Sequence, residues 1–394
     1  FPMGLLQEIF SIKELIAYKT GKPWNPAQTK LNIIQNSIYG VDIEKGAVDI
    51  ARLRFWLSLV VDEEKPKPLP NLDYKIVVGD SLISKFDGEI VEIDWEIKEG
   101  IQTEMFGNEN LQKRKQLLQI LTEKQQTYFD PRNKNKKALA LEIRNCKIDV
   151  LINQLKLMVK KEGLEQMPVK TNFKDNKKFL AAQELYLKTQ GWIKTIHKLK
   201  DLKQHPEKPF NHFDWKLDFP EVLNPYLVPD ENQRGFDIVI GNPPYISTKG
   251  IDGQYKIILE KKFGFADDAY NHFFFKGIQL SKNNGLLTYI SSKTFWTIQT
   301  KKNLRELLLK NTILQLFDTA NPFENAMVDT CVAIVKKAPP HSEHIVLFFD
   351  GKTSFTEPQK YTFPQNDYAN APNKVFFIPT DLNKKIYYKY GKKV

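Results

Sequence analysis

Hydrophobic positions in residues 1–95 follow two different spacings. Steps of three and four residues predict helices over 4–18 and 45–61, while the short apolar runs 37–42 and 74–78 predict strands. Helices that alternate with strands are typical of a parallel α/β sheet, so we expect this region to form part of one.

Between Leu111 and Lys203 the pattern becomes helical throughout. Six apolar residues at steps of three and four form one stripe: Ile148, Leu151, Ile152, Leu155, Met158 and Val159. Gly163 and Pro168 interrupt the pattern, and a further helix is predicted over 179–200. We interpret this region as a helical insertion into the sheet.

The α/β alternation returns in the last part of the chain. Strands are predicted at 236–240, 285–291, 313–317, 330–335 and 345–349, with helices at 269–281 and 301–310. The end of the chain is polar, aromatic and proline-containing, which we interpret as a linker towards a further domain. The predicted organisation is therefore two sheet-forming parts, 1–95 and 231–350, separated by a mostly helical insertion at 96–230 and followed by a linker at 351–394.

The composition is that of a soluble globular protein. Of 394 residues, 41% are hydrophobic and 27% charged, and the mean hydropathy is -0.44, which excludes wholesale disorder. No apolar run approaches the roughly 20 residues that span a bilayer, and residues 1–10 lack a signal-peptide pattern. Cys146 and Cys331 are too few for a disulfide framework. We therefore expect a cytoplasmic protein with two reduced thiols and no membrane partner.

The positive charge of the chain is concentrated in the helical insertion. The whole chain has 58 Lys and Arg against 47 Asp and Glu, and residues 111–203 alone have 22 against 9. A polyanion such as double-stranded DNA suits this segment, because neutralising phosphates releases condensed counterions. Lys134, Lys136 and Lys137 are the candidate contacts to the DNA backbone. A solvated, lysine-rich helix face is the alternative.

The string Gly241-Asn242-Pro243-Pro244-Tyr245 follows directly after the predicted strand 236–240. Open α/β sheets bind ligands at the carboxyl ends of their strands. Two consecutive prolines fix the backbone and lack N–H donors, so neighbouring carbonyl groups are able to face a ligand. The string therefore predicts a rigid set of acceptors beside an aromatic ring, with an ordinary turn as the alternative.

Such acceptors suit an exocyclic aromatic amine such as adenine N6. The lone pair of this nitrogen is delocalised into the ring, and acceptors that hold both N–H groups favour a pyramidal, nucleophilic nitrogen. The side-chain oxygen of Asn242 and the backbone carbonyl of Pro243 are the predicted acceptors. Tyr245 is able to stack on the base, an interaction of about 1–3 kcal/mol that helps to offset the cost of extruding a base from the duplex.

With this motif the chain resembles the amino-group DNA methyltransferases that modify adenine N6, in the gamma order, with cofactor elements before the catalytic loop. The resemblance implies a Rossmann-like, doubly wound α/β sheet, S-adenosylmethionine as methyl donor, and Asn242, Pro243, Pro244 and Tyr245 as the catalytic residues. The long insertion and the stretch from Phe213-Asp214-Trp215 to Pro220-Glu221 resemble the methylase part of fused type IIG restriction-modification enzymes or related phage-defence methylases.

The resemblance also implies cofactor contacts. Asp42, followed by Ile43, matches the acidic strand end that holds the ribose hydroxyls of the donor. Asp80, followed by Ser81 and Leu82, matches the next strand end, whose carboxylate accepts from the donor's adenine amino group. Two aromatic matches complete the set: Phe273 behind the cofactor adenine, and Phe323 with Tyr245 against the flipped base.

In this family a Gly-rich loop wraps the methionine end of the cofactor, and we expect it immediately upstream of Phe1-Pro2-Met3-Gly4. The chain also ends before a target-recognition domain is expected to begin. We therefore interpret the sequence as a fragment, with a target-recognition domain, and in fused enzymes a nuclease domain, elsewhere in the full-length chain.

A nuclease or metal site within the chain has little support from the sequence. Glu96-Ile97-Lys98 fits the Glu-x-Lys pattern of Mg²⁺ nucleases only with Asp80 or Asp87 as its partner, and such short matches are common by chance. His341 and His344 lack a third metal ligand.

We expect site-specific methylation of adenine N6 in DNA as part of a restriction-modification system. Two alternatives stay open. The first is another substrate class, a protein glutamine or an RNA base, because the same loop suits planar amides and amines generally. The second is a DNA-binding fragment without turnover.

Overall fold

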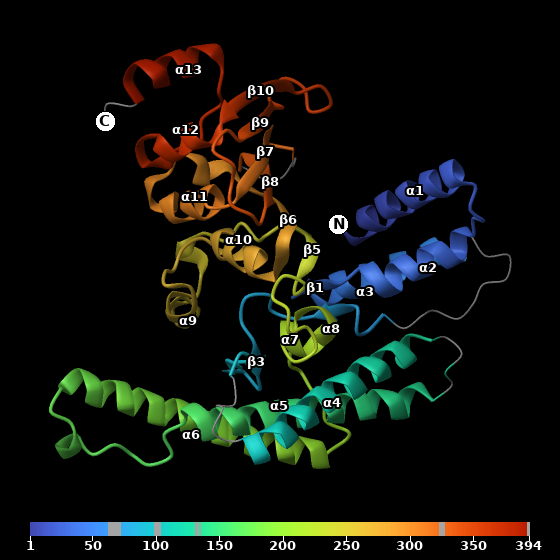
Figure 1. The fold of residues 1–394 in the computed structure, drawn as a ribbon, viewed down its shortest axis with the longest axis vertical. Coiled ribbons are helices and arrows are strands. Elements are labelled where there is room, and N and C mark those ends of the chain that lie inside the picture. Colours follow the sequence, from blue (N-terminus) through green and yellow to red (C-terminus); the bar gives the residue numbers. More distant parts are fainter. Residues whose placement is uncertain (62–71, 98–103, 131–132, 134, 323–327, 392–394) are drawn as a thin grey trace. The chain divides into compact units, whose positions relative to one another are not determined.

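The computed structural model describes residues 1–61, 72–97, 104–130, 133, 135–322 and 328–391. The chain folds as two compact units, Phe1–Pro229 and Asp230–Val394. Figure 1 shows the helices and strands of both units.

The first unit begins with three helices and a two-stranded parallel sheet. Helix α1 (Pro2–Thr20) ends at Gly21, whose φ of 64° lies in the left-handed region that glycine tolerates. The side chain of Asn25 caps α2 (Pro26–Ser37). Strand β1 (Gly40–Asp42) pairs in parallel with β2 (Ile76–Val78), and α3 (Lys45–Val60) lies between them in sequence. One core contains side chains from all three helices and from β2: Leu6, Ile33, Ile34, Val48, Phe55 and Ile76.

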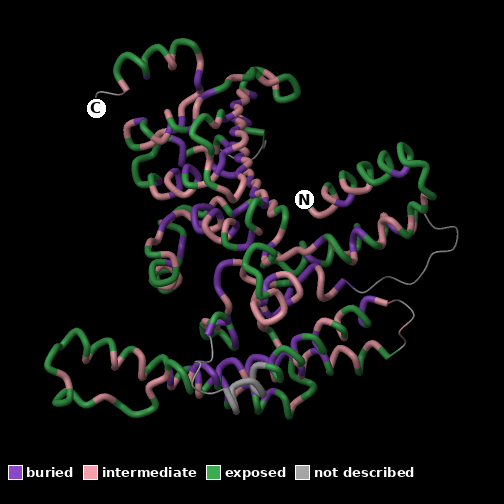
Figure 2. The backbone as a smooth tube through the Cα atoms, viewed as in Figure 1, coloured by how far each residue is buried: buried purple, intermediate pink, exposed green. Residues whose placement is uncertain are grey.

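Three long helices follow: α4 (Glu104–Phe129), α5 (Lys136–Glu162) and α6 (Asn176–Gln204). They lie side by side, with α5 in contact with both neighbours (Figure 1). The predicted apolar stripe of α5 is confirmed, since Ile148, Leu151, Leu155 and Met158 are at most 2% exposed. Residues 159–188, all of which the structure describes, contain no buried position, and Figure 2 shows this exposed end of the α5–α6 pair.

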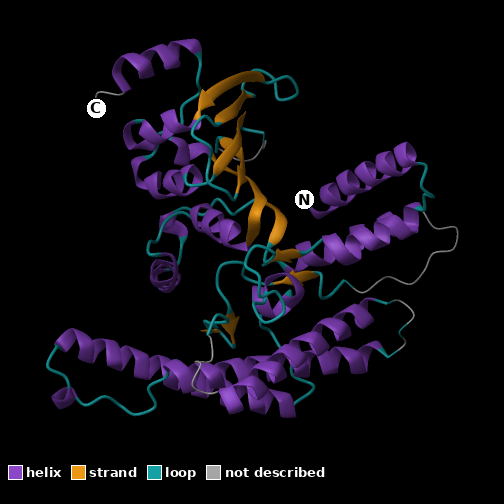
Figure 3. Ribbon diagram, in the orientation of Figure 1, coloured by secondary structure: helices purple, strands orange, loops and turns teal. Residues whose placement is uncertain are grey.

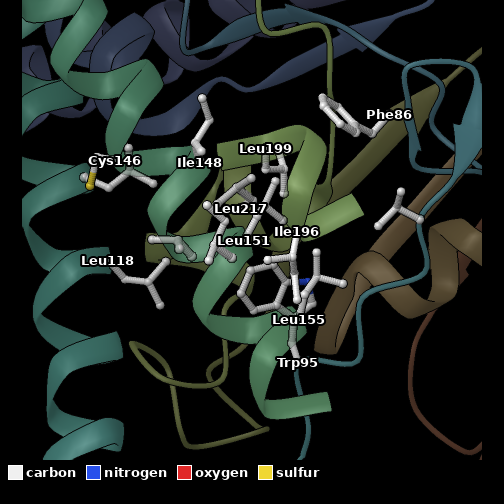
Figure 4. Close-up of a cluster of buried hydrophobic side chains, with 14 of the residues drawn as sticks. Phe86, Trp95, Leu118, Cys146, Ile148, Leu151, Leu155, Ile196, Leu199 and Leu217 are labelled. Atoms are coloured by element: carbon white, nitrogen blue, oxygen red, sulfur yellow. The ribbon is translucent and has the colours of Figure 1, made fainter. Parts of the chain in front are cut away.

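The core of these helices also includes the segments on either side of them in sequence. The short strands β3 (Lys85–Phe86) and β4 (Glu89–Ile90) precede the helices, and α7 (Trp215–Asp218) and α8 (Pro220–Leu223) follow them. Phe86, Trp95 and Leu217 belong to the same buried cluster as the helices (Figure 4). Lys147 of α5 and Asp218 of α7 form a buried ion pair with an N–O distance of 2.5 Å. The insertion therefore shares one core with the segment that follows Asp80.

The second unit contains a six-stranded sheet with the order β10-β9-β7-β8-β6-β5. Its strands have the following bounds: β5 Phe236–Gly241, β6 Ser281–Ser292, β7 Thr312–Ala320, β8 Thr330–Lys336, β9 Ile345–Asp350 and β10 Gln359–Pro364. The pairs β5–β6 and β7–β9 are parallel, whereas β8 runs antiparallel to both β6 and β7. The predicted strands are confirmed, but the sheet is mixed rather than parallel. The reason is the short connection between β7 and β8, because a parallel crossover needs a dozen or more residues.

Helices α10 (Ala269–Leu280), α11 (Lys302–Leu309) and α12 (Gln365–Asn370) line this sheet and share its core (Figure 3). The second unit also contains α9 (Gly253–Phe263) and α13 (Asp381–Ile386). Tyr270 and Phe274 of α10 and Leu304 and Leu308 of α11 are buried against the strands. The helices predicted at 269–281 and 301–310 are thus confirmed.

The end of the chain differs from the expected linker at 351–394. Strand β10 pairs over six residues with β9, so it extends the sheet. Phe363, Tyr368 and Phe376 are at most 1% exposed and belong to the core of the second unit. We expected a linker because the segment is polar on average. Its aromatic side chains nevertheless supply enough apolar area to pack into the core of the second unit.

Within the described residues, no helix has both the length and the apolar character needed to cross a bilayer.

Candidate functional site

Asp42 is the last residue of β1, and its side chain is exposed at the carboxyl end of that strand. One carboxylate oxygen accepts from the backbone N–H of Glu44 at 2.9 Å. The backbone carbonyl of Asp42 accepts from the N–H of Gly79 at 2.9 Å. Ile43 beside it is 66% exposed. The local hydrogen bonds thus fix the loop after β1, while the carboxylate remains accessible to solvent.

Asp80 begins the loop that follows β2. Its Oδ1 accepts from the backbone N–H groups of Leu82 and Ile83 at 2.9 and 3.2 Å, and its Oδ2 is 4.0 Å from Lys85 Nζ. Leu82 is buried and Ser81 is half-buried. The two N–H donors orient the carboxylate, since bonds to a charged acceptor are the stronger kind.

The two acidic strand ends lie at the same edge of the small sheet. Asp42 is the register partner of Val78 in the parallel pair β1–β2, and the bond from Gly79 joins the two loops directly. The carboxyl edge of parallel strands is the usual place for a ligand in α/β sheets. The structure therefore brings Asp42 and Asp80 together.

Sequence reasoning assigned no role to the Phe213-Asp214-Trp215 stretch, yet it holds the Asp80 loop. Trp215 Nε1 donates to the carbonyl of Ser81 at 3.0 Å, and Asp214 accepts from the hydroxyl of Ser84 at 3.3 Å. The Phe213 ring packs so closely on Gly79 that a Cβ there would come within 2.3 Å of it. The stretch was visible in the sequence, but its partners are more than a hundred residues away.

Glu221, at the end of the same stretch, holds the segments that lead into the two strands. It accepts from the Tyr39 hydroxyl at 3.0 Å and from Lys75 Nζ at 3.3 Å. Lys75 also lies 4.0 Å from the centre of the Tyr39 ring. Burial, together with Glu221, raises the pKa of Tyr39 well above its usual range, so the hydroxyl remains a donor. Glu221 thus braces the starts of β1 and β2, and Asp214 and Trp215 brace the loop after β2.

The Asn242–Tyr245 loop lies at the carboxyl end of β5 in the second unit. Gly241 pairs with Tyr289 of the parallel strand β6, and a Cβ at Gly241 would be 3.1 Å from that ring. Pro243 is buried, whereas Asn242 and Pro244 are exposed. The buried ring anchors the loop and leaves the Asn242 amide facing solvent.

Tyr245 is half-buried, and its hydroxyl is enclosed without a hydrogen-bond partner among the described residues. Burial, with a smaller contribution from the nearby Cys331, raises the pKa of Tyr245 to about 12. The phenol is therefore protonated at neutral pH. An aromatic ring at this position is able to stack on a base, and the hydroxyl is not used by the loop itself.

The remaining candidates are placed as follows. Phe273 lies on α10 and is half-buried beside the core of the second unit. Phe323 and Lys134 lie outside the described residues. Lys136 is half-exposed and Lys137 is exposed, both at the start of α5. Asp42 and Asp80 belong to the first unit, and Asn242–Tyr245 and Phe273 belong to the second.

The nuclease and metal alternatives gain nothing from the geometry. Glu96 pairs with Lys216 at 2.7 Å, and Lys98 lies outside the described residues. No three His, Cys, Asp or Glu side chains come together as a metal site in the described parts of the chain.

Residues 36–323 match the family model described as Eco57I restriction-modification methylase. This span includes Asp42, Asp80 and the Asn242–Tyr245 loop, and it takes in more than half of the chain. The chain belongs to the Eco57I restriction-modification methylase family. The resemblance to fused restriction-modification methylases is thereby confirmed at the level of the family.

Two curated relatives show how this Eco57I-family chain compares in length. A protein of Methanocaldococcus jannaschii named as a type II restriction enzyme and methyltransferase is 29% identical in an alignment of length 374 that covers 89% of this chain and 30% of that protein. The type II restriction enzyme and methyltransferase RM.Eco57I of Escherichia coli is 27% identical in an alignment of length 148 that covers 35% of this chain and 14% of that protein. The chain thus spans about a third or less of the length of these relatives.

Solved structures of restriction-modification enzymes are more distant from this Eco57I-family chain. The type IIL enzyme MmeI in complex with DNA is 14% identical, with 78% of this chain and 42% of that chain covered and a TM-score of 0.29. The type IIG restriction endonuclease BpuSI is 14% identical, with 65% and 40% covered and a TM-score of 0.29. At these scores the family assignment rests on the sequence match.

Proposed function

We propose that the protein transfers a methyl group from S-adenosylmethionine to adenine N6 in double-stranded DNA, as the methylase of a restriction-modification system. The observation that carries this proposal is the Asn242–Tyr245 loop directly after β5, with Pro243 buried and the Asn242 amide exposed. Membership of the Eco57I family supports the reaction class. The proposal includes a Rossmann-like, doubly wound fold with residues 96–230 as its insertion.

The side chains at the carboxyl edge of the β1–β2 sheet fit S-adenosylmethionine. The exposed carboxylate of Asp42 is a suitable acceptor for vicinal ribose hydroxyls, and Ile43 offers apolar surface beside it. The Asp80 loop, with Ser81 and Leu82, lies at the same sheet edge and is oriented by its own N–H donors. When bound, the cofactor supplies the methyl group on a positively charged sulfur.

Phe273 of the second unit is the aromatic residue that we assign to the cofactor adenine. It is half-buried on α10, so part of its ring remains available for contact. Phe323, the second aromatic residue assigned to the target base, follows Asn321-Pro322 in the sequence.

The chain's own residues act on the target amine. Asn242 Oδ1 and the Pro243 carbonyl accept from the two N–H groups of adenine N6, which makes its lone pair available to the methyl carbon. The nitrogen–methyl bond forms as the methyl–sulfur bond breaks, S-adenosylhomocysteine leaves, and N6 releases one of its two protons to water. Tyr245 stacks on the extruded base and holds its plane. Fixed acceptors are effective because they need no reorganisation when charge develops on the nitrogen. No covalent bond to the protein is required.

A product analysis tests the proposal. The full-length protein is incubated with duplex DNA and methyl-labelled S-adenosylmethionine, and the nucleosides are separated by liquid chromatography and mass spectrometry. Label in N6-methyladenine is the expected result. Label in RNA or in a protein glutamine under matched conditions supports the alternative substrate class, and no label in any substrate supports a DNA-binding role without turnover.

A further inference from the structure

Asp268 joins helix α10 to the segment that follows the catalytic loop. It is the N-cap residue of α10, but its carboxylate accepts no hydrogen bond from the helix's own N–H groups. Its Oδ1 instead accepts from the backbone N–H of Thr248 at 2.8 Å and from the Thr248 hydroxyl at 2.9 Å. The N–H of Ala269 donates to the carbonyl of Ile246 at 2.9 Å. Three hydrogen bonds therefore attach the residues just after Tyr245 to the start of α10.

The other oxygen of the same carboxylate faces Lys301. Lys301 Nζ is 2.8 Å from Asp268 Oδ2 and also forms an ion pair with Asp267, and its side chain is 6% exposed. A lysine at this depth needs such partners, since an unpaired buried charge is strongly unfavourable. Lys301 precedes α11, which packs against α10, so the lysine comes from a different element of the unit (Figure 1).

Burial by itself raises the pKa of Asp268, but the hydrogen bonds from Lys301 and Thr248 outweigh it, and the net pKa is lowered. The carboxylate is therefore charged at neutral pH. Charged acceptors form the shorter and stronger hydrogen bonds, which makes this connection to Thr248 stiff.

We propose that Asp268 and Lys301 are positioning residues for methyl transfer, which hold the downstream end of the catalytic loop, and with it Tyr245, against helix α10. The inference rests on the proposed function of that loop. Pro243 anchors the loop at its upstream side, and the Asp268–Thr248 bonds anchor it at the other side. Because α10 also carries Phe273, the pair links the loop for the target base to the helix assigned to the cofactor.

A stabilising ion pair without any role in positioning is the competing explanation, and matched variants separate the two. Asp268→Ala removes the acceptor of Thr248. Asp252→Ala removes an ordinary N-cap from α9 of the same unit, where Asp252 accepts from its own helix at 2.9 and 3.2 Å. Lys301→Met is matched by Lys302→Met at the neighbouring position, whose side chain is 48% exposed.

We expect Asp268→Ala and Lys301→Met in the full-length protein to lower kcat about tenfold or more, because small displacements of reacting groups are costly. The KM for S-adenosylmethionine is expected to change less than about twofold, since the Asp42 and Asp80 loops are untouched. Asp268→Asn, which retains an oxygen acceptor for Thr248, is expected to recover part of kcat. Asp252→Ala and Lys302→Met are expected to retain kcat, whatever the change in melting temperature.

Thr248→Ala adds a variant on the loop side that leaves the buried charges intact. It removes the hydroxyl that donates to Asp268 at 2.9 Å and to Asp267 at 3.4 Å, and a kcat about threefold lower is expected. If the folded Asp268→Ala and Thr248→Ala proteins keep the kcat of the wild type, the positioning role is refuted.

Hydrogen exchange at the Thr248 amide tests the same contact without turnover. Exchange is expected to become faster in Asp268→Ala and Lys301→Met but to stay unchanged in Lys302→Met. Unaltered protection at Thr248 refutes the proposal that Asp268 and Lys301 hold the loop against α10, even if methylation is lost. A wild type that methylates no adenine refutes the proposed function instead, and the exchange result still decides whether Asp268 and Lys301 hold the loop.

Discussion

Asn242 and Pro243 are sequence neighbours with opposite environments at the end of β5. The buried proline ring restricts the backbone, and the adjacent Asn242 is exposed. One residue of rigid backbone is thus enough to aim an acceptor. The consequence is that the chemistry of the loop should depend on the side-chain oxygen of Asn242 and much less on its amide nitrogen.

Asn242→Ala is expected to lower kcat of the full-length protein by about 100-fold or more, the usual cost of one lost preorganised partner in a transition state. Cofactor binding, measured by calorimetry, is expected to persist because Asp42 and Asp80 are unchanged. Asn242→Asp keeps an oxygen acceptor and serves as the matched control, with most of the activity retained. Equal activity in Asn242→Ala and the wild type would exclude the side chain from the reaction.

Tyr245 allows the ring and the hydroxyl to be separated. The hydroxyl is enclosed and lacks a hydrogen-bond partner in the described part of the structure, so Tyr245→Phe removes a group that contributes no bond. Tyr245→Phe is therefore expected to keep kcat and stability. Tyr245→Ala is expected to lose about 1–3 kcal/mol of base stacking. Methylation kinetics with both variants measure the difference, and a large loss in Tyr245→Phe would show that the hydroxyl acts on the substrate.

His272 gives the second unit a specific pH dependence. Burial lowers the pKa of His272 from 6.5 to about 4, against the opposing effect of Asp267, and the ring is fully buried and stacked on Phe265. The unfolded chain therefore binds a proton at a higher pH than the folded chain does. The stability that depends on the neutral ring is fully present above pH 6.5 and is lost as the pH falls towards 4.

Wild-type protein is accordingly expected to lose up to about 3 kcal/mol of unfolding free energy from this group across that window. His272→Gln, which does not titrate, should show a weaker decline. Denaturant titrations at several pH values between 7 and 4 measure both curves. Parallel curves for the two proteins would mean that His272 is protonated equally in the folded and unfolded states.

At the scale of elements, the spacing of apolar residues predicted the helices and strands that depend on a local pattern. The stripe of α5 and the helix α10 were predicted because each buries one face. The strand β5 was predicted from its short apolar run, although none of its residues is buried. The loop after β5 was also recognisable from its two prolines.

Contacts between distant residues left no such pattern. Trp215 meets Ser81 across 134 positions, and Lys301 meets Asp267 across 34. These pairings arise from the topology of the fold, and a single sequence does not encode them as periodicity. The packing of β10 was missed for a related reason, since its partner strand decides whether an aromatic segment is buried.

The brace from Trp215 to the Asp80 loop predicts an effect on cofactor binding. Trp215→Phe removes the Nε1 donor to the Ser81 carbonyl but keeps most of the aromatic packing. The loss of one hydrogen bond is expected to weaken S-adenosylmethionine binding by about 1 kcal/mol, with kcat at saturating cofactor little changed. Trp24→Phe, the same substitution at a tryptophan that packs on Phe10, is the control. Identical affinities of the two variants for S-adenosylmethionine would show that the Trp215 hydrogen bond does not affect cofactor binding by the Asp80 loop.

At the scale of the whole molecule, the insertion has an excess of positive charge and shares one core with the segment that follows Asp80. Several of its lysines are already neutralised, since Lys194 and Lys198 pair with Asp87 and Glu89 at the hairpin after β2. The excess charge therefore belongs to lysines elsewhere on these helices. This distinction decides which residues are available for phosphate contact.

Lys136 and Lys137 at the start of α5 belong to the available group, with no ion pair among the described residues. If they contact the DNA backbone, Lys136→Gln with Lys137→Gln is expected to weaken binding about equally on specific and random duplexes. The slope of log affinity against log salt should flatten by about two units, because each phosphate contact contributes nearly one.

Lys194→Gln with Lys198→Gln, which removes paired lysines, is the control and is expected to leave the slope unchanged. Fluorescence anisotropy between 50 and 200 mM salt, roughly the range over which phosphate contacts dominate, measures all three proteins. An unchanged slope in the first variant would indicate that this end of the insertion is a spacer or a docking surface for another domain.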